Sequence, residues 1–375
     1  MNRYRKSKKA QIELTFNWIY ILIAGAVIML FFVGIVVKQK TVSEEKLSGE
    51  VVRILESILA GAGVSEKTKN PIYMGGLADY TFYFECENEV SNFGIKGKPA
   101  KAENSIDPVF APKEIKTTKM LLWSLPYKLP FKVMDFLIVS SSNNKYYLVG
   151  NDADFVEEFM NLTDGFNREY LFNLDEISAK GESLQVRVID VDGTNVPAKG
   201  IPEALINFDD DKVSAIVFTG KSQVDFYQKK GSSWSKLNKN PVRIISIGGE
   251  RDAAKYAAIF SGDDQTYQCN MKKAFKRLTI LTEVYGGEGI GQLEIGGKLK
   301  EIVDYYQERP ELSLSNDCLN QLTVYDNNVM NLLGDLKSTA SACELDEDSC
   351  VELMNIANDL KKVNNDLRLN CIKLY

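Results

Sequence analysis

The chain contains no histidine among its 375 residues. This absence excludes catalytic triads that use histidine, zinc sites with histidine ligands and histidine general bases. The six cysteines include no C-x-x-C pair, so we do not expect a zinc site made of cysteines alone either. The sequence therefore predicts no metal, no cofactor and no catalytic site.

An excess of positive charge is also missing, because the net charge is −6 and the pI is about 5.2. Nucleic-acid binding would require a basic patch interleaved with aromatic residues, and the body of the chain has none. We therefore expect no nucleic-acid partner, and we predict no small-molecule substrate. Residue 60 is followed by 315 residues (375 − 60), which is enough for one large or two ordinary domains with a buried core.

One long apolar run is present near the amino terminus. Residues 16–37, FNWIYILIAGAVIMLFFVGIVV, carry no charge, and as a helix they span about 33 Å, which is one bilayer crossing. Five Lys or Arg residues precede the run, whereas only Lys38 and Lys40 follow it closely. The positive-inside rule then predicts a cytoplasmic amino terminus and an exported body after Val37. A cleaved secretory signal is the alternative, but no good small-x-small cleavage site follows the run.

The residues before this run resemble a processing site. In KKAQIELTF a basic tail ends in Ala10, Gln11 follows, and Phe16 opens the apolar helix. This arrangement resembles the class III signal peptide of archaeal type IV pilin-like proteins, and the resemblance covers about the first 40 residues. It differs at Glu13 and Thr15, where the family usually has Ser and Glu. The resemblance implies cleavage between Ala10 and Gln11, and contacts with pilin-like subunits or envelope proteins. The alternative is a plain signal anchor.

A second apolar pattern continues beyond the run. Apolar residues recur at three- and four-residue spacing with charged residues between them, which predicts an amphipathic helix. These residues are Leu47, Val51, Ile54, Leu55, Ile58 and Leu59. No proline interrupts residues 16–60, so the span and this stalk can form one continuous helix. The alternative is a juxtamembrane helix that packs on its own globular domain.

We predict an α+β fold in three parts. Residues 1–60 are the cytoplasmic tail, the span and the stalk, residues 61–285 are an α+β exported domain, and residues 286–375 are a helical unit. Within the exported domain, YTFYFEC alternates so that Phe82, Phe84 and Cys86 share one face of a strand.

Three further segments of the body carry clear local patterns. Residues 131–140 and 145–149 flank the sequence SSNN and predict a β-hairpin. The β-branched segments SLQVRVIDV, VSAIVFTG and SQVDFYQ predict a mixed sheet. The glycine-rich residues 286–297 match no phosphate-binding loop and predict a flexible linker.

One internal pattern resembles an enzyme family. VIDVDGT, followed by AIVFTGKS, resembles the first two motifs of haloacid dehalogenase-like phosphatases. The resemblance implies Asp190 as nucleophile, Asp192 as acid and base, Thr219 as a phosphoryl ligand, and Mg²⁺ held by Asp190 with an acidic pair such as Asp263 and Asp264. However, only IPEALINF is left for the crossover helix that parallel strands require. The Asp-Gly pair is also typical of a hairpin turn.

The carboxyl-terminal part predicts a helix at residues 298–309 and two longer helices, at 319–336 and 353–367, that pack antiparallel. In such a pair of helices, residues that face each other have residue numbers with a common average. The pairs Cys318–Cys371 and Cys343–Cys350 have nearly the same average, and Cys86 and Cys269 remain as the third pair. This predicts three disulfides in an oxidising compartment: Cys318–Cys371 at the base, Cys343–Cys350 at the tip, and Cys86–Cys269. The alternative is six reduced thiols in a chain whose membrane orientation is the reverse of the predicted one.

Asn161 is the first residue of the glycosylation sequon Asn161-Leu162-Thr163. Chance occurrence also explains such a short pattern.

These observations favour a single-pass, membrane-anchored protein whose body is exported. Because no catalytic constellation stands out, we expect a structural or adhesion component, pilin-like or otherwise part of the cell envelope. The competing function is a membrane-anchored exported phosphatase.

Overall fold

The computed structural model describes residues 23, 26–30, 46, 48–61, 69–178, 185–220, 222–249, 251–286, 298–309, 315–323, 328–345 and 350–371. The predicted processing site, Ala10 and Gln11, lies outside these residues, as do most of the predicted span and of the linker at 286–297. Within the described ranges, no helix is both long enough and apolar enough to cross a membrane. The span, its orientation and the cleavage stay predictions.

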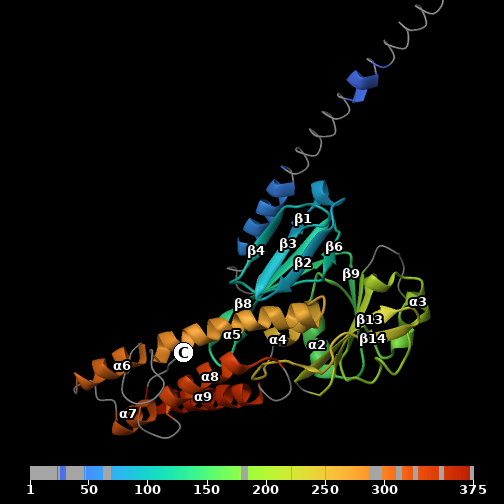
Figure 1. The fold of residues 1–375 in the computed structure, drawn as a ribbon. Coiled ribbons are helices and arrows are strands. Elements are labelled where there is room, and N and C mark those ends of the chain that lie inside the picture. The colour runs from blue at the N-terminus through green and yellow to red at the C-terminus, as the bar shows by residue number, and fades with distance from the viewer. Residues whose placement is uncertain are drawn as a thin grey trace, which may run out of the picture.

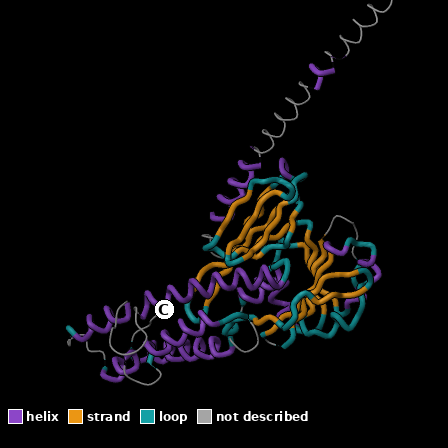
Figure 2. The backbone as a smooth tube through the Cα atoms, viewed as in Figure 1, coloured by secondary structure: helices purple, strands orange, loops and turns teal. Residues whose placement is uncertain are grey.

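The described chain is a mixed α+β structure built on three β-sheets (Figure 1 and Figure 2), as the sequence predicts. The amino-terminal sheet has the order β4-β3-β2-β6, the central sheet β1-β7-β8-β5, and the mixed sheet β10-β9-β11-β12-β13-β14, with β15 paired to β13. The strands are β1 (Lys69–Tyr73), β2 (Phe82–Glu87), β3 (Val90–Ile95), β4 (Lys101–Asn104), β5 (Val109–Phe110), β6 (Glu114–Ile115), β7 (Lys119–Lys128), β8 (Lys132–Ser141), β9 (Asn144–Val149), β10 (Asn167–Leu171), β11 (Gln185–Asp190), β12 (Val213–Phe218), β13 (Gln223–Lys230), β14 (Ser233–Lys236) and β15 (Val242–Arg243).

Helices lie between the sheets and form one end of the molecule. The labelled α-helices are α2 (Ala153–Leu162), α3 (Glu203–Ile206), α4 (Ala253–Phe260), α5 (Asp264–Gly286), α6 (Lys298–Gln307), α7 (Asn316–Thr323), α8 (Val329–Ala342) and α9 (Val351–Asn370). Short 3-10 turns occur at Gly75–Leu77, Leu174–Glu176 and Asp210–Lys212. Figure 1 shows α5 running from the sheets to the group formed by α6, α7, α8 and α9.

Alternation along the strands separates three apolar cores. On β7, Met120 and Leu122 face the core that the central sheet shares with the amino-terminal sheet. Trp123 faces the opposite way, into the largest core, which continues into the carboxyl-terminal helices. The mixed sheet covers that core with Tyr146 and turns Tyr147 toward a third core on its other face. Successive strand residues point to opposite faces, so the central sheet and the mixed sheet are each buried on both faces.

Residues 48–61 form the helix that the second apolar pattern predicts. Its buried face consists of Val51, Val52, Leu55 and Leu59, which join the core shared by the amino-terminal and central sheets. Ile54, which the spacing places on the same stripe, is 56% exposed. In the described part of the chain this helix therefore packs on its own domain, which is the alternative that the sequence left open.

Leu55→Ala is expected to lower the free energy of unfolding by about 3 kcal/mol, because Leu55 is only 2% exposed and the truncation leaves a cavity. The matched control is Ile54→Ala on the same helix, for which we expect a change below about 0.5 kcal/mol. Urea unfolding of the two variants measures both values. Equal effects would show that the helix does not pack on the sheets in solution.

The predicted hairpin at 131–149 is wrong, because its two strands belong to different sheets. β8 pairs with β7 and β5 in the central sheet, whereas β9 pairs with β10 and β11 in the mixed sheet. The Ser141 hydroxyl donates to Asn144 Oδ1 at 2.7 Å and closes the turn between them. The chain thus passes from one sheet to the next at this corner.

The predicted mixed sheet is confirmed. β9, β10, β11 and β12 run parallel, and β13 and β14 continue the sheet antiparallel. The connection from β9 to β10 contains α2, whose Phe159 lies in the largest core. The connection from β11 to β12 contains α3, whose Leu205 lies in the third core. The two connections therefore cover opposite faces, and the strand order reverses between β9 and β11.

The carboxyl-terminal helices differ from prediction at one point. The single helix expected over residues 319–336 is instead two, α7 and α8. A new helix begins after Asn328, because the Asn328 side chain accepts a hydrogen bond from Asn331 N at 2.8 Å and caps the amino end of α8. α8 packs against both α5 and α9, and its buried residues join the largest core. The helical unit therefore shares one core with the end of α5.

Candidate functional site

The structure forms all three predicted disulfides and leaves no cysteine free. They are Cys86–Cys269, Cys318–Cys371 and Cys343–Cys350, with Cα–Cα distances of 5.8, 5.3 and 4.8 Å. The tip bond closes the connection between α8 and α9, and the base bond joins α7 to the end of α9. The prediction of the pairs holds even though the first helix of the hairpin is divided.

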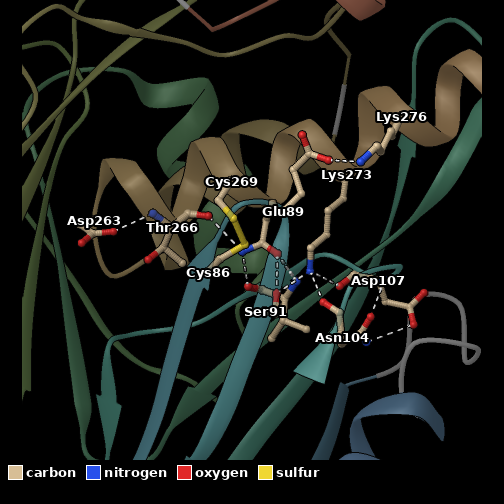
Figure 3. The surroundings of a disulfide bond; sticks show 12 residues. Cys86, Glu89, Ser91, Asn104, Asp107, Asp263, Thr266, Cys269, Lys273 and Lys276 are labelled. Atoms are coloured by element: carbon tan, nitrogen blue, oxygen red, sulfur yellow. Dashed lines mark hydrogen bonds and ion pairs between the residues drawn. A yellow bond between two sulfur atoms is a disulfide. The ribbon is translucent and has the colours of Figure 1, made fainter. Parts of the chain in front are cut away.

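The Cys86–Cys269 bond lies in a polar contact between the amino-terminal sheet and α5 (Figure 3). Cys86 shares the buried face of β2 with Phe82 and Phe84, as the alternation predicts. Beside the bond, the fully buried Asn270 of α5 uses both ends of its amide. Its Oδ1 accepts from Ser91 Oγ and Val109 N, each at 3.0 Å, and its Nδ2 donates to Val109 O at 2.9 Å and to Thr266 O at 3.0 Å.

Lys273 is the second polar residue of this contact, one helical turn after Asn270. Its ammonium donates to Ser91 Oγ at 2.6 Å, Asn104 O at 2.7 Å and Asp107 O at 3.2 Å, and the residue is 2% exposed. Burial lowers the pKa of Lys273 from 10.5 to about 8. Neither residue can be recognised from the sequence, because polar residues on a helix with an apolar stripe are usually solvated. All three hydrogen bonds of the ammonium connect α5 to the amino-terminal sheet and the loop that follows it. This contact is therefore structural and is not an open binding site.

Because the pKa of Lys273 is lowered, we expect the free energy of unfolding to rise with pH above pH 8. The folded-state pKa of about 8 lies below the ordinary value of 10.5, so between them the unfolded chain binds more protons and the free energy of unfolding rises with pH. Below pH 8 both states are protonated and the group contributes no slope. Urea unfolding between pH 8 and pH 9.5 should show a slope of up to about 1.4 kcal/mol per pH unit that Lys273→Met removes. Lys276→Met, at an exposed lysine, should retain it; equal slopes in the two variants would contradict the assignment.

The residues of the phosphatase resemblance are only partly brought together. Asp190 and Asp192 lie at and just after the carboxyl end of β11, and Thr219 follows the neighbouring parallel strand β12. Asp263 and Asp264 lie at the start of α5, near the amino end of the same sheet, where Asp263 Oδ2 pairs with Lys113 Nζ at 2.7 Å. Because β11 is roughly 16 Å long, the two acidic pairs do not meet at one Mg²⁺.

The Asp190 carboxylate is occupied by its own loop. Oδ1 accepts from Gly193 N at 3.0 Å, and Oδ2 accepts from Asn195 N at 2.8 Å and Val196 N at 2.7 Å. Burial raises the pKa of Asp190, although these N–H groups oppose the shift. The expected hairpin turn is wrong, because β11 and β12 are parallel, yet Gly193 does adopt a left-handed φ of 72°. Asp190 therefore organises the loop that leads to α3.

Asp190→Asn should lower the free energy of unfolding by about 2 kcal/mol. Asparagine keeps one acceptor oxygen but turns an NH₂ group toward backbone N–H donors that are buried with it. The control is Asp175→Asn, whose side chain is 74% exposed and which should change little. The same variant serves in a Mg²⁺-dependent phosphatase assay, where we expect no activity in either protein. Activity that Asp190→Asn abolishes would establish the competing function.

Asn161 occupies the last turn of α2 and is exposed. The hydroxyl of Thr163, the third residue of the sequon, donates to Phe159 O at 2.6 Å, and Thr163 is fully buried. Glycosylation at Asn161 stays a prediction.

A pocket of about 390 Å³ opens at the amino end of the mixed sheet, on the side of the sheet that faces α4. Its walls come from three directions: residues 112–114 beside the amino-terminal sheet, residues 210–212 before β12, and residues 259–262 at the end of α4. Its floor is a polar row across four adjacent strands, formed by Tyr146, Arg187, Ser214 and Gln228 in register. This row cannot be recognised from the sequence, because only the register of the folded sheet aligns its four residues.

Arg187 is the buried charge of this pocket, with 7% of its surface exposed. Its Nη2 donates to Ser261 O at 2.8 Å and to Ala258 O at 3.4 Å, at the carboxyl end of α4, while Nε is buried without a partner in the described structure. The guanidinium also lies 5.6 Å from the centre of the Phe226 ring. Burial lowers the pKa of Arg187 to about 10, so the side chain stays charged at neutral pH.

No described group of three or more acidic or cysteine side chains is arranged to hold a metal ion. Comparison of the chain with known protein families, with characterised proteins and with solved structures finds no match in any of the three. The function of the protein therefore has to be inferred from its own sequence and structure.

Proposed function

We propose that the protein is a structural or adhesion component of the cell envelope that a pilin-like amino-terminal helix anchors in the membrane. The observation that carries the anchoring part of this proposal is the burial of Val51, Val52, Leu55 and Leu59 against the sheets, whereas the pilin-like part depends on the resemblance at Ala10, Gln11 and Phe16. The helix at residues 48–61, which follows the predicted span in the sequence, is thereby part of the body's own core. A body joined to its anchor in this way is held at the membrane surface and cannot swing freely on a linker.

The covalent cross-links support an exported body. All six cysteines are paired in the structure, and such bonds persist in oxidising compartments, not in a reducing cytoplasm. Each bond contributes about 2 to 5 kcal/mol, mainly by restricting the unfolded chain. Export and cross-linking together suit a protein that has to keep its shape outside the cell.

Mass spectrometry of the protein from native membranes tests the anchor. We expect the mature chain to begin at Gln11 and the protein to appear in filaments sheared from the cell surface. An intact Met1 tail would leave the signal anchor in place of the pilin-like anchor. Digestion of intact cells with an added protease tests the orientation separately, because an exported body is cleaved without permeabilising the cells.

A further inference from the structure

The pocket at the amino end of the mixed sheet holds a positive charge that the described protein neutralises only at a distance. Asp263 is the carboxylate that acts on the pKa of Arg187, and it already pairs with Lys113. Two other acidic residues of the wall are also paired, Glu114 with Lys96 and Asp210 with Lys229. The remaining one, Asp211, is exposed and is not among the charges that act on the pKa of Arg187. A buried guanidinium is costly without a hydrogen-bonded counter-charge, and this one has five N–H donors.

The polar groups on either side of Arg187 are also unused. Gln185 precedes it by two residues and so shares its face of β11, and Ser214 lies opposite it on β12. Both side chains line the pocket, are half-buried, and make no hydrogen bond to another described residue. A hydroxyl and an amide of this kind bind neutral hydroxyl groups, whereas an arginine fits a carboxylate.

We propose that this pocket binds a hydroxylated carboxylate, the chemistry of a hexuronic acid, with the carboxylate on Arg187 and the hydroxyl groups on Gln185 and Ser214. The pocket volume of about 390 Å³ falls within the usual range for small-molecule sites. The binding does not depend on filament assembly. It differs from the expectation, made from the sequence, that the protein has no small-molecule substrate, and the titration below decides between the two.

Arg187 also closes the end of α4, so a structural role has to be separated from binding. Its two hydrogen bonds to Ala258 O and Ser261 O use a single nitrogen, Nη2. A purely structural arginine would affect stability alone. A ligand-binding arginine also changes affinity in a folded protein, and that affinity depends on the carboxylate of the ligand.

Isothermal titration of the purified full chain with glucuronate, glucose and acetate tests the proposal. Glucuronate should bind saturably with a Kd below about 1 mM, and glucose and acetate at least about tenfold more weakly. Equal binding of glucose would refute the role of the carboxylate, and equal binding of acetate would refute the role of the hydroxyl groups. No binding of glucuronate would overturn the proposal as a whole.

Single substitutions test the binding roles of Arg187, Gln185 and Ser214. Arg187→Met should weaken glucuronate binding at least about tenfold, because it removes a charge-assisted contact. The matched control is Arg168→Met on β10, which removes a part-buried arginine outside the pocket and should leave the affinity unchanged. If Arg187→Met does not fold, Gln185→Ala and Ser214→Ala should still weaken binding several-fold, since neither side chain has a partner in the described structure. Unchanged affinity in these two variants would overturn the assignment.

Discussion

Replacing Cys86 and Cys269 together by serine should lower the free energy of unfolding by about 5 kcal/mol, the largest effect that we expect from any change. The bond joins positions 183 residues apart, so its loss releases a very long loop in the unfolded chain. It also replaces the bond by two serine hydroxyl groups in the contact between β2 and α5. Urea unfolding of the full chain, followed by circular dichroism, measures the difference.

The matched control for this variant is the double serine replacement of Cys343 and Cys350. That bond spans only 7 residues, so the same chain-entropy reasoning gives about 2 to 3 kcal/mol. The ratio between the two pairs is the informative quantity, because general effects of removing a disulfide cancel in it. Equal losses would show that the long cross-link does not restrict the unfolded chain.

Asn270→Leu is expected to cost about 4 kcal/mol, although leucine is close in size and more apolar. The amide makes four hydrogen bonds to Ser91, Val109 and Thr266, and the backbone groups of Val109 then lose their partners. Each buried group that is left without a partner costs about 1 to 3 kcal/mol.

Gln268→Leu is the control for Asn270→Leu, because it lies on the same helix and is only half-buried. Its amide bonds Asp264 within the helix at 3.4 Å, so we expect a change below about 1 kcal/mol. Amide hydrogen exchange at Val109 gives a second readout, since its N–H loses the Asn270 acceptor. Unchanged protection at Val109 would contradict the geometry of this network.

The cross-links could be predicted from the sequence because an antiparallel helix pair imposes a common midpoint. Cys318–Cys371 and Cys343–Cys350 meet this condition, and inward-facing Cys86 then has one partner left, Cys269. The condition tolerates the break between α7 and α8, since both halves follow the same direction along α9. The break itself could not be read from an apolar spacing that continues across it, although Asn328 is a residue that favours helix starts.

The corner between β8 and β9 could not be predicted, because a tight polar turn between two strands looks the same whether or not the strands pair. One signal was available. The two strands carry the unbroken apolar or aromatic runs FLIV, at residues 136–139, and YYLV, at residues 146–149, and the structure buries every residue from Leu137 to Ser141 and from Tyr146 to Val149. Strands buried on both faces belong to the middle of layered sheets, whereas an exposed hairpin alternates between apolar and polar residues.

The Arg187 pocket shows a different limit of sequence reading. A single arginine within SLQVRVIDV reads as one polar position of a strand, with no indication that it is buried. Its partners in the row, Tyr146, Ser214 and Gln228, lie on three other strands, and register alone brings them together. Only the assembled sheet shows that a charge and two unpaired polar groups lie side by side.

The bond between β2 and α5 also fixes the path of mechanical load. Tension applied between the amino-terminal helix and α9 passes from Cys86 to Cys269 through the sulfur atoms, and the covalent chain between these two residues, 183 positions apart, carries none. That stretch holds the whole mixed sheet, with the Arg187 pocket, and would extend to roughly 600 Å if it were pulled straight. When its two ends are pulled apart, the oxidised protein therefore keeps nearly half of its chain folded behind the disulfide, and the pocket keeps its shape.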